Sequence, residues 1–195
     1  MIRLSRRPAI AAALFLLGGC ASLAPAAVGK LATFDPLSAE PGSVAVAVKT
    51  DERLVLRTGD VVMRITLKPR GAEPGFDEAF DLEVLAAAEA PAIQTGPHEH
   101  VLVARVAPVD HARLASTQQR ARAARGQGRG AFSVAIRGAC RSGDVDPADL
   151  VVSTYLRTTP GEPYFPLTRE IRLARAIGAD AVAAIPPCDR AATAR

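Results

Sequence analysis

Apolar and polar side chains alternate along many short stretches of this chain, and this period of two limits the fold more than any other feature. Every second residue from Val61 to Leu67 is large and apolar, whereas Arg64 and Thr66 take positions between them and Lys68 follows. Successive side chains of a β-strand point to opposite faces of a sheet, so the pattern predicts a strand with one buried face. Similar stretches, separated by turn residues, occur near residues 44–48, 54–56, 80–84, 99–107, 132–136, 150–157 and 165–173.

One segment, residues 110–125, has the character of a helix. Asp110 can cap its N-terminus, Gly126 can end it, and its Ala, Gln, Arg and Leu content favours helix. Leu114 is its only large apolar residue, so we expect it to lie over an edge or rim of a sheet. Seven or eight strands with this one inserted α-helix predict an antiparallel β-sandwich over residues 43–175, because no regular strand–helix alternation supports a parallel sheet.

The first 20 residues have a separate pattern. Arg3, Arg6 and Arg7 precede a short apolar run that ends at Leu17-Gly18-Gly19-Cys20. A helix that spans a bilayer needs about 20 apolar residues, and this run has roughly half that number. The arrangement resembles the precursors of bacterial lipoproteins, in which a signal peptide (here residues 1–19) is removed in front of a cysteine that becomes the lipid-modified first residue.

This resemblance implies a lipid anchor on Cys20. A thioether-linked diacylglycerol, usually joined by an amide-linked acyl chain, would hold the mature chain at a membrane, since two or more acyl chains anchor stably and one does not. Residues 20–42 are rich in Ala and Pro and are expected to act as a flexible tether. In the family's sorting pattern, an aspartate directly after the lipid-modified cysteine favours the inner membrane. This chain has Ala21 at that position, so we expect the mature protein at the periplasmic face of the outer membrane.

The resemblance also bears on the other two cysteines. With Cys20 assigned to lipid, Cys140 and Cys188 are left as an even pair in an oxidising compartment, and a disulfide between them is predicted. Two free buried thiols are the alternative, and two cysteines are too few for a metal site. Residues 176–195 show no clear period, so we expect an irregular tail that is stapled to the domain by Cys188 and frays beyond it.

The formal net charge of +4 comes mostly from the N-terminal segment. The chain has 24 Lys and Arg against 20 Asp and Glu, and removal of residues 1–19 takes away three arginines and no acid, which leaves 21 basic and 20 acidic residues. Proteins that bind nucleic acids need a clear basic excess. We therefore expect no nucleic-acid partner.

The strongest local bias in charge lies between His111 and Gly143, where seven arginines occur without an acidic residue. Such a surface could bind an anionic lipid headgroup, a glycan phosphate or an acidic partner. The alternative, which we favour, is a solvated helix surface whose last arginines complement the helix dipole. The candidate anion-binding residues are Arg113, Arg120, Arg122, Arg125 and Arg129. At 100° per residue, Arg113 and Arg120 can lie on one side of the helix, and the other three project differently.

Other motifs are weaker. Gly126-Gln127-Gly128-Arg129-Gly130 resembles a phosphate loop in composition, but it follows a helix and precedes a strand, the reverse of nucleotide-binding loops. His98 and His100 share one face of a strand but supply only two of the three or four ligands that a metal needs. Asp144, Asp146 and Asp149 lack the glycine and glutamate of an EF-hand loop. We read these segments as a connector, an exposed loop and a turn.

No nucleophile–base motif is found: the chain contains neither G-x-S-x-G nor H-E-x-x-H. We therefore predict no enzyme, no cofactor and no metal. The lead hypothesis is a lipid-anchored cell-envelope protein with a non-catalytic binding or structural role, with a membrane contact through the anchor and another envelope protein as a partner. The first alternative is a module that binds anionic lipid, glycan or an acidic partner through the arginine-rich helix region. The second is a periplasmic enzyme whose reacting groups converge from distant positions.

Overall fold

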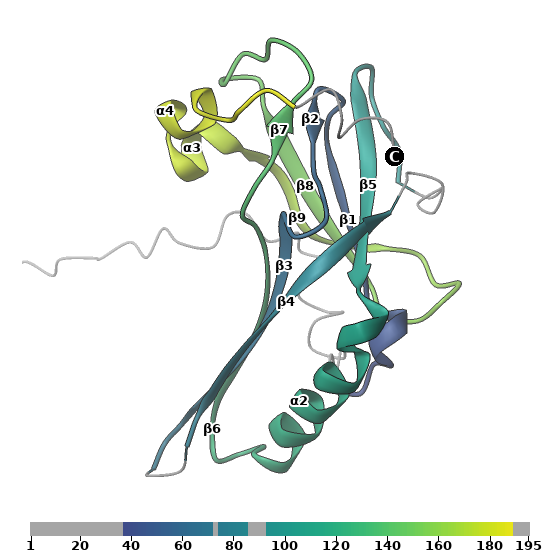
Figure 1. Ribbon diagram of the computed structural model, residues 1–195, viewed down its shortest axis with the longest axis vertical. Coiled ribbons are helices and arrows are strands. Elements are labelled where there is room, and N and C mark those ends of the chain that lie inside the picture. Colours follow the sequence, from purple (N-terminus) through teal and green to yellow (C-terminus); the bar gives the residue numbers. More distant parts are fainter. Residues whose placement is uncertain (1–36, 72–73, 86–92, 189–195) are drawn as a thin grey trace, which may run out of the picture.

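The computed structural model describes residues 37–71, 74–85 and 93–188, and Figure 1 shows its arrangement. Seven strands form one antiparallel sheet in the order β6-β3-β4-β5-β1-β8-β9, and two short strands, β2 and β7, pair separately. The strands of the large sheet are β1 Ala45–Asp51, β3 Val61–Pro69, β4 Phe76–Leu85, β5 Glu99–Val106, β6 Gly128–Ile136, β8 Val151–Arg157 and β9 Phe165–Arg172. The short pair is β2 Leu54–Val55 and β7 Cys140–Arg141.

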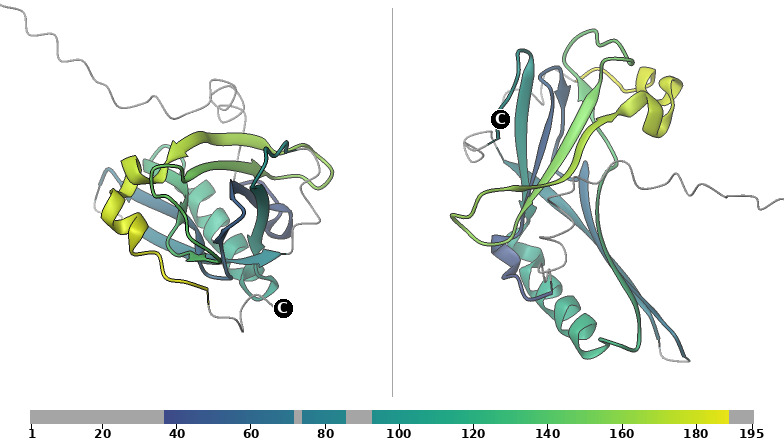
Figure 2. Two further views of the ribbon diagram at one scale, coloured as in Figure 1. Left: turned by 90° about the horizontal axis from the view of Figure 1, so that it is seen from above. Right: turned by 180° about the vertical axis from the view of Figure 1, so that it is seen from behind.

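The large sheet curls strongly, so that its concave face encloses the main core (Figure 2). Phe80 and Leu82 of β4 and Leu156 of β8 are all almost fully buried there. The mainly β class and the inserted helix are confirmed, but the predicted sandwich is not a clear description of this fold, since the described strands form half a barrel. The right-handed twist of seven strands accumulates into this curl, and a register shift between Val152 and Thr154 bends the β8–β9 edge further.

Strand β5 lies inside the sheet and is covered on both faces. Ala104 and Val106 belong to the main core, whereas Val101 and Val103 pack on the outer face of the sheet. Two tyrosines, Tyr155 and Tyr164, and Ile93 are packed against this outer cluster, which also contains Ala45 and Ala47. The two apolar faces of β5 are thus used by two separate clusters.

The predicted helix is present as a 3₁₀ turn, η3 (Pro108–Asp110), followed directly by α2 (His111–Ala123). The capping role that we predicted for Asp110 is wrong. Its backbone continues the preceding turn in a helical conformation and no side-chain cap forms; the carboxylate instead accepts a hydrogen bond from Arg113 Nε at 3.0 Å. Beyond the helix, Gly126 has φ +82°, a conformation that favours glycine and turns the chain toward β6.

At the opposite end of the sheet the chain is joined by a disulfide. The sulfurs of Cys140 and Cys188 are 1.99 Å apart, and the Cys188 N–H donates to the Arg141 carbonyl at 2.8 Å. The expectation of an irregular tail is wrong for its first part: α3 (Leu173–Ile177) and α4 (Ala179–Ala183) follow β9. They cover a small apolar cluster in which Leu54, Leu150 and Val182 are buried.

The N-terminal residues that carry the lipoprotein resemblance, Leu17 to Cys20, lie outside the described residues, as does the tether up to residue 36. A short 3₁₀ turn, η1 (Pro41–Ser43), leads into β1. Among the helices of the described ranges, none has the length and apolar character that crossing a bilayer requires.

Candidate functional site

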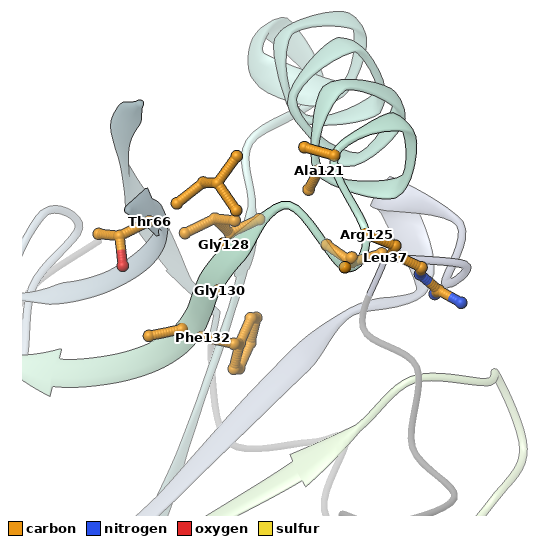
Figure 3. Close-up of a pocket in the computed structure, with 12 residues that line it drawn as sticks. Leu37, Thr66, Ala121, Arg125, Gly128, Gly130 and Phe132 are labelled. Atoms are coloured by element: carbon orange, nitrogen blue, oxygen red, sulfur yellow. The ribbon is translucent and has the colours of Figure 1, made fainter. Parts of the chain in front are cut away.

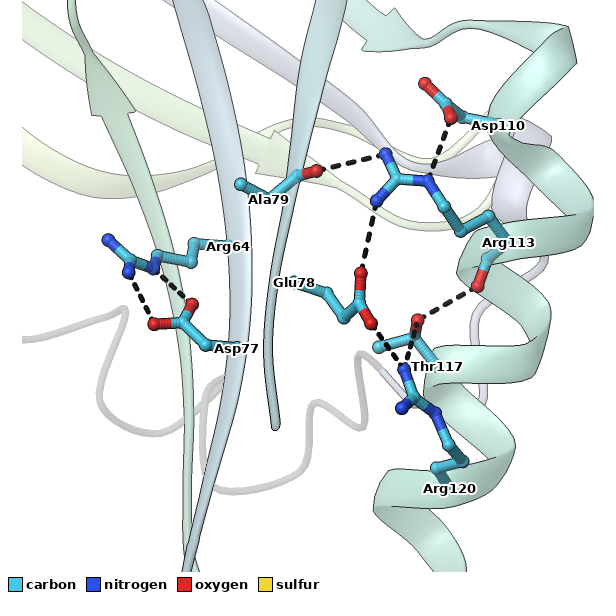
Figure 4. Close-up of polar contacts among 8 residues, drawn as sticks. All are labelled: Arg64, Asp77, Glu78, Ala79, Asp110, Arg113, Thr117 and Arg120. Carbon is cyan, nitrogen blue, oxygen red and sulfur yellow. Dashed lines mark hydrogen bonds and ion pairs between the residues drawn. The ribbon is translucent and has the colours of Figure 1, made fainter. Parts of the chain in front are cut away.

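Two of the five candidate arginines converge on one carboxylate of strand β4 (Figure 4). Arg113 Nη1 lies 3.3 Å from Glu78 Oε2, and Arg120 Nη2 lies 2.6 Å from Glu78 Oε1. The guanidinium of Arg113 also stacks on Phe80 at 3.9 Å from the ring centroid, and that of Arg120 on Phe76 at 4.7 Å. These two charges therefore fasten α2 to β4, and an external anion would have to compete with carboxylates already in place.

The other three arginines point to different places. Arg122 donates to the backbone carbonyl of Leu37, and Arg125 lines a cavity beside the end of α2. Arg129 is exposed at a position of β6 whose side chains alternate with the inward-facing Phe132. As the spacing predicts, Arg113 and Arg120 share one side of the helix. The five arginines do not form a single anion-binding surface.

The cavity lies between the C-terminal half of α2 and the inner face of strands β3 and β6 (Figure 3). Its volume is about 280 Å³, close to the lower limit of roughly 300 Å³ for small-molecule sites. We call it the α2 groove. Its lining residues are mostly apolar or small: Leu37, Ile65, Thr66, Leu67, Ala121, Ala124, Arg125, Gly126, Gly128, Gly130, Ala131 and Phe132.

The groove exists because strand β6 loses its side chains on the inner face. Ile136, Val134 and Phe132 pack against the main core, and the next two inward positions are Gly130 and Gly128. Side chains alternate along a strand, so the row of large residues on this face ends where the glycines begin. The Gly-x-Gly pattern that the sequence suggested was a connector is thus the floor of the groove.

The backbone geometry requires glycine at residue 128 but not at residue 130. A Cβ on Gly128 would clash with the Lys68 carbonyl oxygen and lie 2.8 Å from Pro69 Cα, so the close approach of the β3 backbone requires glycine there. A Cβ on Gly130 would meet only the Thr66 carbonyl oxygen, at 3.8 Å. A side chain at residue 130 is therefore sterically allowed, and its absence leaves open space.

The helix contributes small residues to the same space. Ala121 is buried and Ala124 follows it at the helix end, so α2 approaches β3 and β6 without large side chains between them. A second, more open hollow of about 480 Å³ lies next to the groove and shares Leu67 and Ala124 with it. Arg120 lines this second hollow. Figure 3 shows the Arg125 guanidinium turned away from the β6 side of the groove.

The histidine and aspartate motifs have structural partners. His98 Nδ1 lies 2.9 Å from Glu52 Oε1, and His100 Nε2 lies 2.9 Å from the Leu54 carbonyl oxygen. Asp146 accepts a hydrogen bond from the Ala148 backbone N–H, as expected of a residue that starts a turn. In the parts of the chain that the structure describes, no group of three metal-ligating side chains is found.

The candidate site is therefore the α2 groove rather than the arginine-rich helix as a whole. Sequence reasoning named Arg125 but missed the apolar space beside it. The signal that could have revealed it is the loss of large residues from one face of a predicted strand. Comparisons with protein-family models, with curated proteins and with solved structures found no match.

Proposed function

We propose that this chain is a lipid-anchored cell-envelope protein with a non-catalytic binding role, and that the α2 groove is its binding site. The lipoprotein pattern that ends at Cys20 supports the anchor. The bond between Cys140 and Cys188 is of a kind that persists in oxidising compartments, which agrees with a place outside the cytoplasm.

The observation that carries the binding role is the chemistry of the groove lining. Among the described residues that line it, only Thr66 and Arg125 have polar side chains. Catalysis of group transfer or hydrolysis needs a nucleophile, an acid or a base within reach of the substrate, and these described lining residues supply no carboxylate, imidazole or thiol. A preformed apolar space with one cation at its side suits retention of a ligand better than a reaction.

Binding in this groove would be driven by removal of apolar surface from water, at about 25 cal/mol per Å². The small volume limits the ligand to a short apolar group or to one part of a larger molecule. An alkyl chain meets both conditions, since it is narrow and needs no hydrogen-bond partners. We therefore take alkyl groups as the ligand class to test first.

The first experiment is photolabelling of the acylated full-length protein in phosphatidylcholine vesicles with a neutral diazirine-bearing octanol. Mass spectrometry should place the label on residues 121–132. Gly130→Leu should remove this labelling, because its side chain would fill the groove. Ser133→Leu adds the same group on an exposed β6 position and should leave the labelling unchanged. Labelling that is spread over the surface, or that persists in Gly130→Leu, would contradict the proposal.

The anchor has its own test. Intact-mass and peptide analysis of membrane-extracted protein should identify acylated Cys20 as the first residue. The Cys20→Ser variant should leave the membrane fraction or accumulate as the unprocessed precursor. A Cys20→Ser protein that is processed normally and still fractionates with membranes would refute the anchor without affecting the groove.

A further inference from the structure

We infer that the α2 groove takes one acyl chain of an anionic phospholipid from the membrane that holds the protein, with the lipid phosphate at Arg125. This inference rests on the proposed function, because it names the ligand of the same groove. It combines three observations: the size of the groove, the charge of its described lining, and the short stretch of sequence between Cys20 and the lining residue Leu37.

The volume of the groove indicates that it holds part of a lipid molecule rather than a whole one. About 280 Å³ is too small to enclose a two-chain phospholipid, whereas ligand sites for whole drug-sized molecules reach about 1,000 Å³. The groove therefore takes part of one chain, and the rest of the molecule stays outside. A lipid that keeps its other chain in a bilayer meets this condition.

The charge around the groove decides between anionic and neutral headgroups. Within the described ranges, the residues that line the groove include Arg125 and no acidic residue, and none occurs in the sequence from His111 to Gly143. Arg113 and Arg120 are balanced by Glu78 and Asp110, so they add little net field. A guanidinium has five N–H donors, so Arg125 can hold two phosphate oxygens in addition to contacts within the protein.

The position of Leu37 decides between a soluble amphiphile and a membrane lipid. Leu37 lines the groove, so the chain that leads back to Cys20 is joined to the groove at this residue. Sixteen residues separate Cys20 from Leu37, a span of at most about 60 Å even when fully extended. With an acylated Cys20, the groove is held close to a membrane surface, where phospholipid is the most concentrated amphiphile.

The test compares two photoreactive lipids in vesicles that contain the acylated full-length protein. One vesicle set carries a trace of diazirine-phosphatidylglycerol and the other a trace of diazirine-phosphatidylcholine, each with the reactive group on one acyl chain. We expect phosphatidylglycerol to label residues 121–132 at least five-fold more than phosphatidylcholine. Gly130→Leu should abolish the labelling, and Ser133→Leu should not.

A pair of charge variants tests the role of the headgroup contact. Arg125→Gln should bring the two lipids to equal labelling. Arg129→Gln removes the same charge from an exposed position of β6 and should keep the preference. Urea unfolding midpoints close to wild type will show that all four variants are folded.

The outcomes separate this inference from the proposed function. Equal labelling by both lipids in the wild type overturns the anionic headgroup, and complete competition by soluble glycerol 3-phosphate overturns the acyl chain. In both cases groove labelling by the neutral octanol would leave the proposed function standing. If neither the octanol nor the lipids label residues 121–132, both fail.

Discussion

At one end of the curled sheet, the β2–β7 pair, α3, α4 and the Cys140–Cys188 bond close the fold; we call this the stapled end. At the other end, the C-terminal half of α2 closes over β3 and β6; we call this the groove end. The cavity beside Leu54 and Val182 at the stapled end has a volume of only about 10 Å³, whereas the α2 groove has about 280 Å³. One end is filled and covalently joined, and the other is held by a few contacts around open space.

The difference follows from residue size and from the kind of attachment. Leu54, Leu150 and Val182 fill the stapled end, whereas Gly130 and Ala121 leave the groove end open. Regions that bind ligands commonly belong to the less stable parts of a protein, because they must admit another molecule. We therefore infer that the stapled end provides stability to the fold, so that the groove end can be loosely packed.

The largest expected effect is at the disulfide. Replacement of both Cys140 and Cys188 by alanine should lower the free energy of unfolding by about 4 kcal/mol, the chain-entropy value for a crosslink with the 48-residue separation seen here. Urea unfolding under oxidising conditions measures this change. Groove labelling by the neutral octanol should survive below the unfolding transition. A loss under about 0.5 kcal/mol would mean that the stapled end does not carry the stability that we assign to it.

The second largest loss of stability is expected when α2 loses Leu114, its one large apolar side chain. Leu114 is 1% exposed and packs in the main core, so Leu114→Ala should cost about 3 kcal/mol through lost burial and a new cavity. Val109→Ala is the matched control, since Val109 is 87% exposed beside the same helix and should change stability by less than about 0.5 kcal/mol. Equal effects of the two substitutions would show that α2 is not anchored through Leu114.

Much of the fold could be predicted because it depends on local patterns. The alternation from Val61 to Leu67 and the composition of α2 act within a few residues, and both elements form where they were expected. The curl could not be predicted, because it arises from the twist of the whole sheet and from the β8–β9 register shift. Helices α3 and α4 have five residues each, too few to show a helical period.

The candidate site was predicted only in part. The charge bias of the arginines is visible in the sequence, but the carboxylate that pairs with Arg113 and Arg120 is Glu78, which lies 35 residues before the first of them. Long-range pairing of this kind leaves no local signal. The groove did leave one, since the inward row of β6 passes from Phe132 to Gly130, but its meaning depends on α2 lying opposite.

A smaller effect is expected at Glu78, which joins α2 to β4. Glu78→Gln should lower the free energy of unfolding by about 1 kcal/mol, because exposed ion pairs contribute roughly 0–1 kcal/mol each and two of them would be lost. Glu162→Gln removes an exposed carboxylate elsewhere and serves as the control. Urea unfolding gives both values. The variant should also weaken the preference of lipid labelling for residues 121–132, because freed Arg113 and Arg120 become alternative anion sites.

The smallest expected effect is a pH dependence of stability at the Lys49–Glu99 ion pair, which joins β1 to β5. The Gly96 backbone N–H, at 2.7 Å, and the Lys49 ammonium, at 2.9 Å, hold the pKa of Glu99 below its ordinary value of 4.5. A carboxylate whose pKa is lower in the folded than in the unfolded state stabilises the fold fully above the unfolded value and loses this contribution as the pH falls through the folded value. Glu99→Gln should therefore cost up to about 1 kcal/mol at pH 7 and progressively less toward pH 3, since its side chain is 31% exposed and partly screened. Urea unfolding of wild type and variant across this range measures the gap between them. A gap that stays constant with pH would show that residue 99 acts through packing rather than charge.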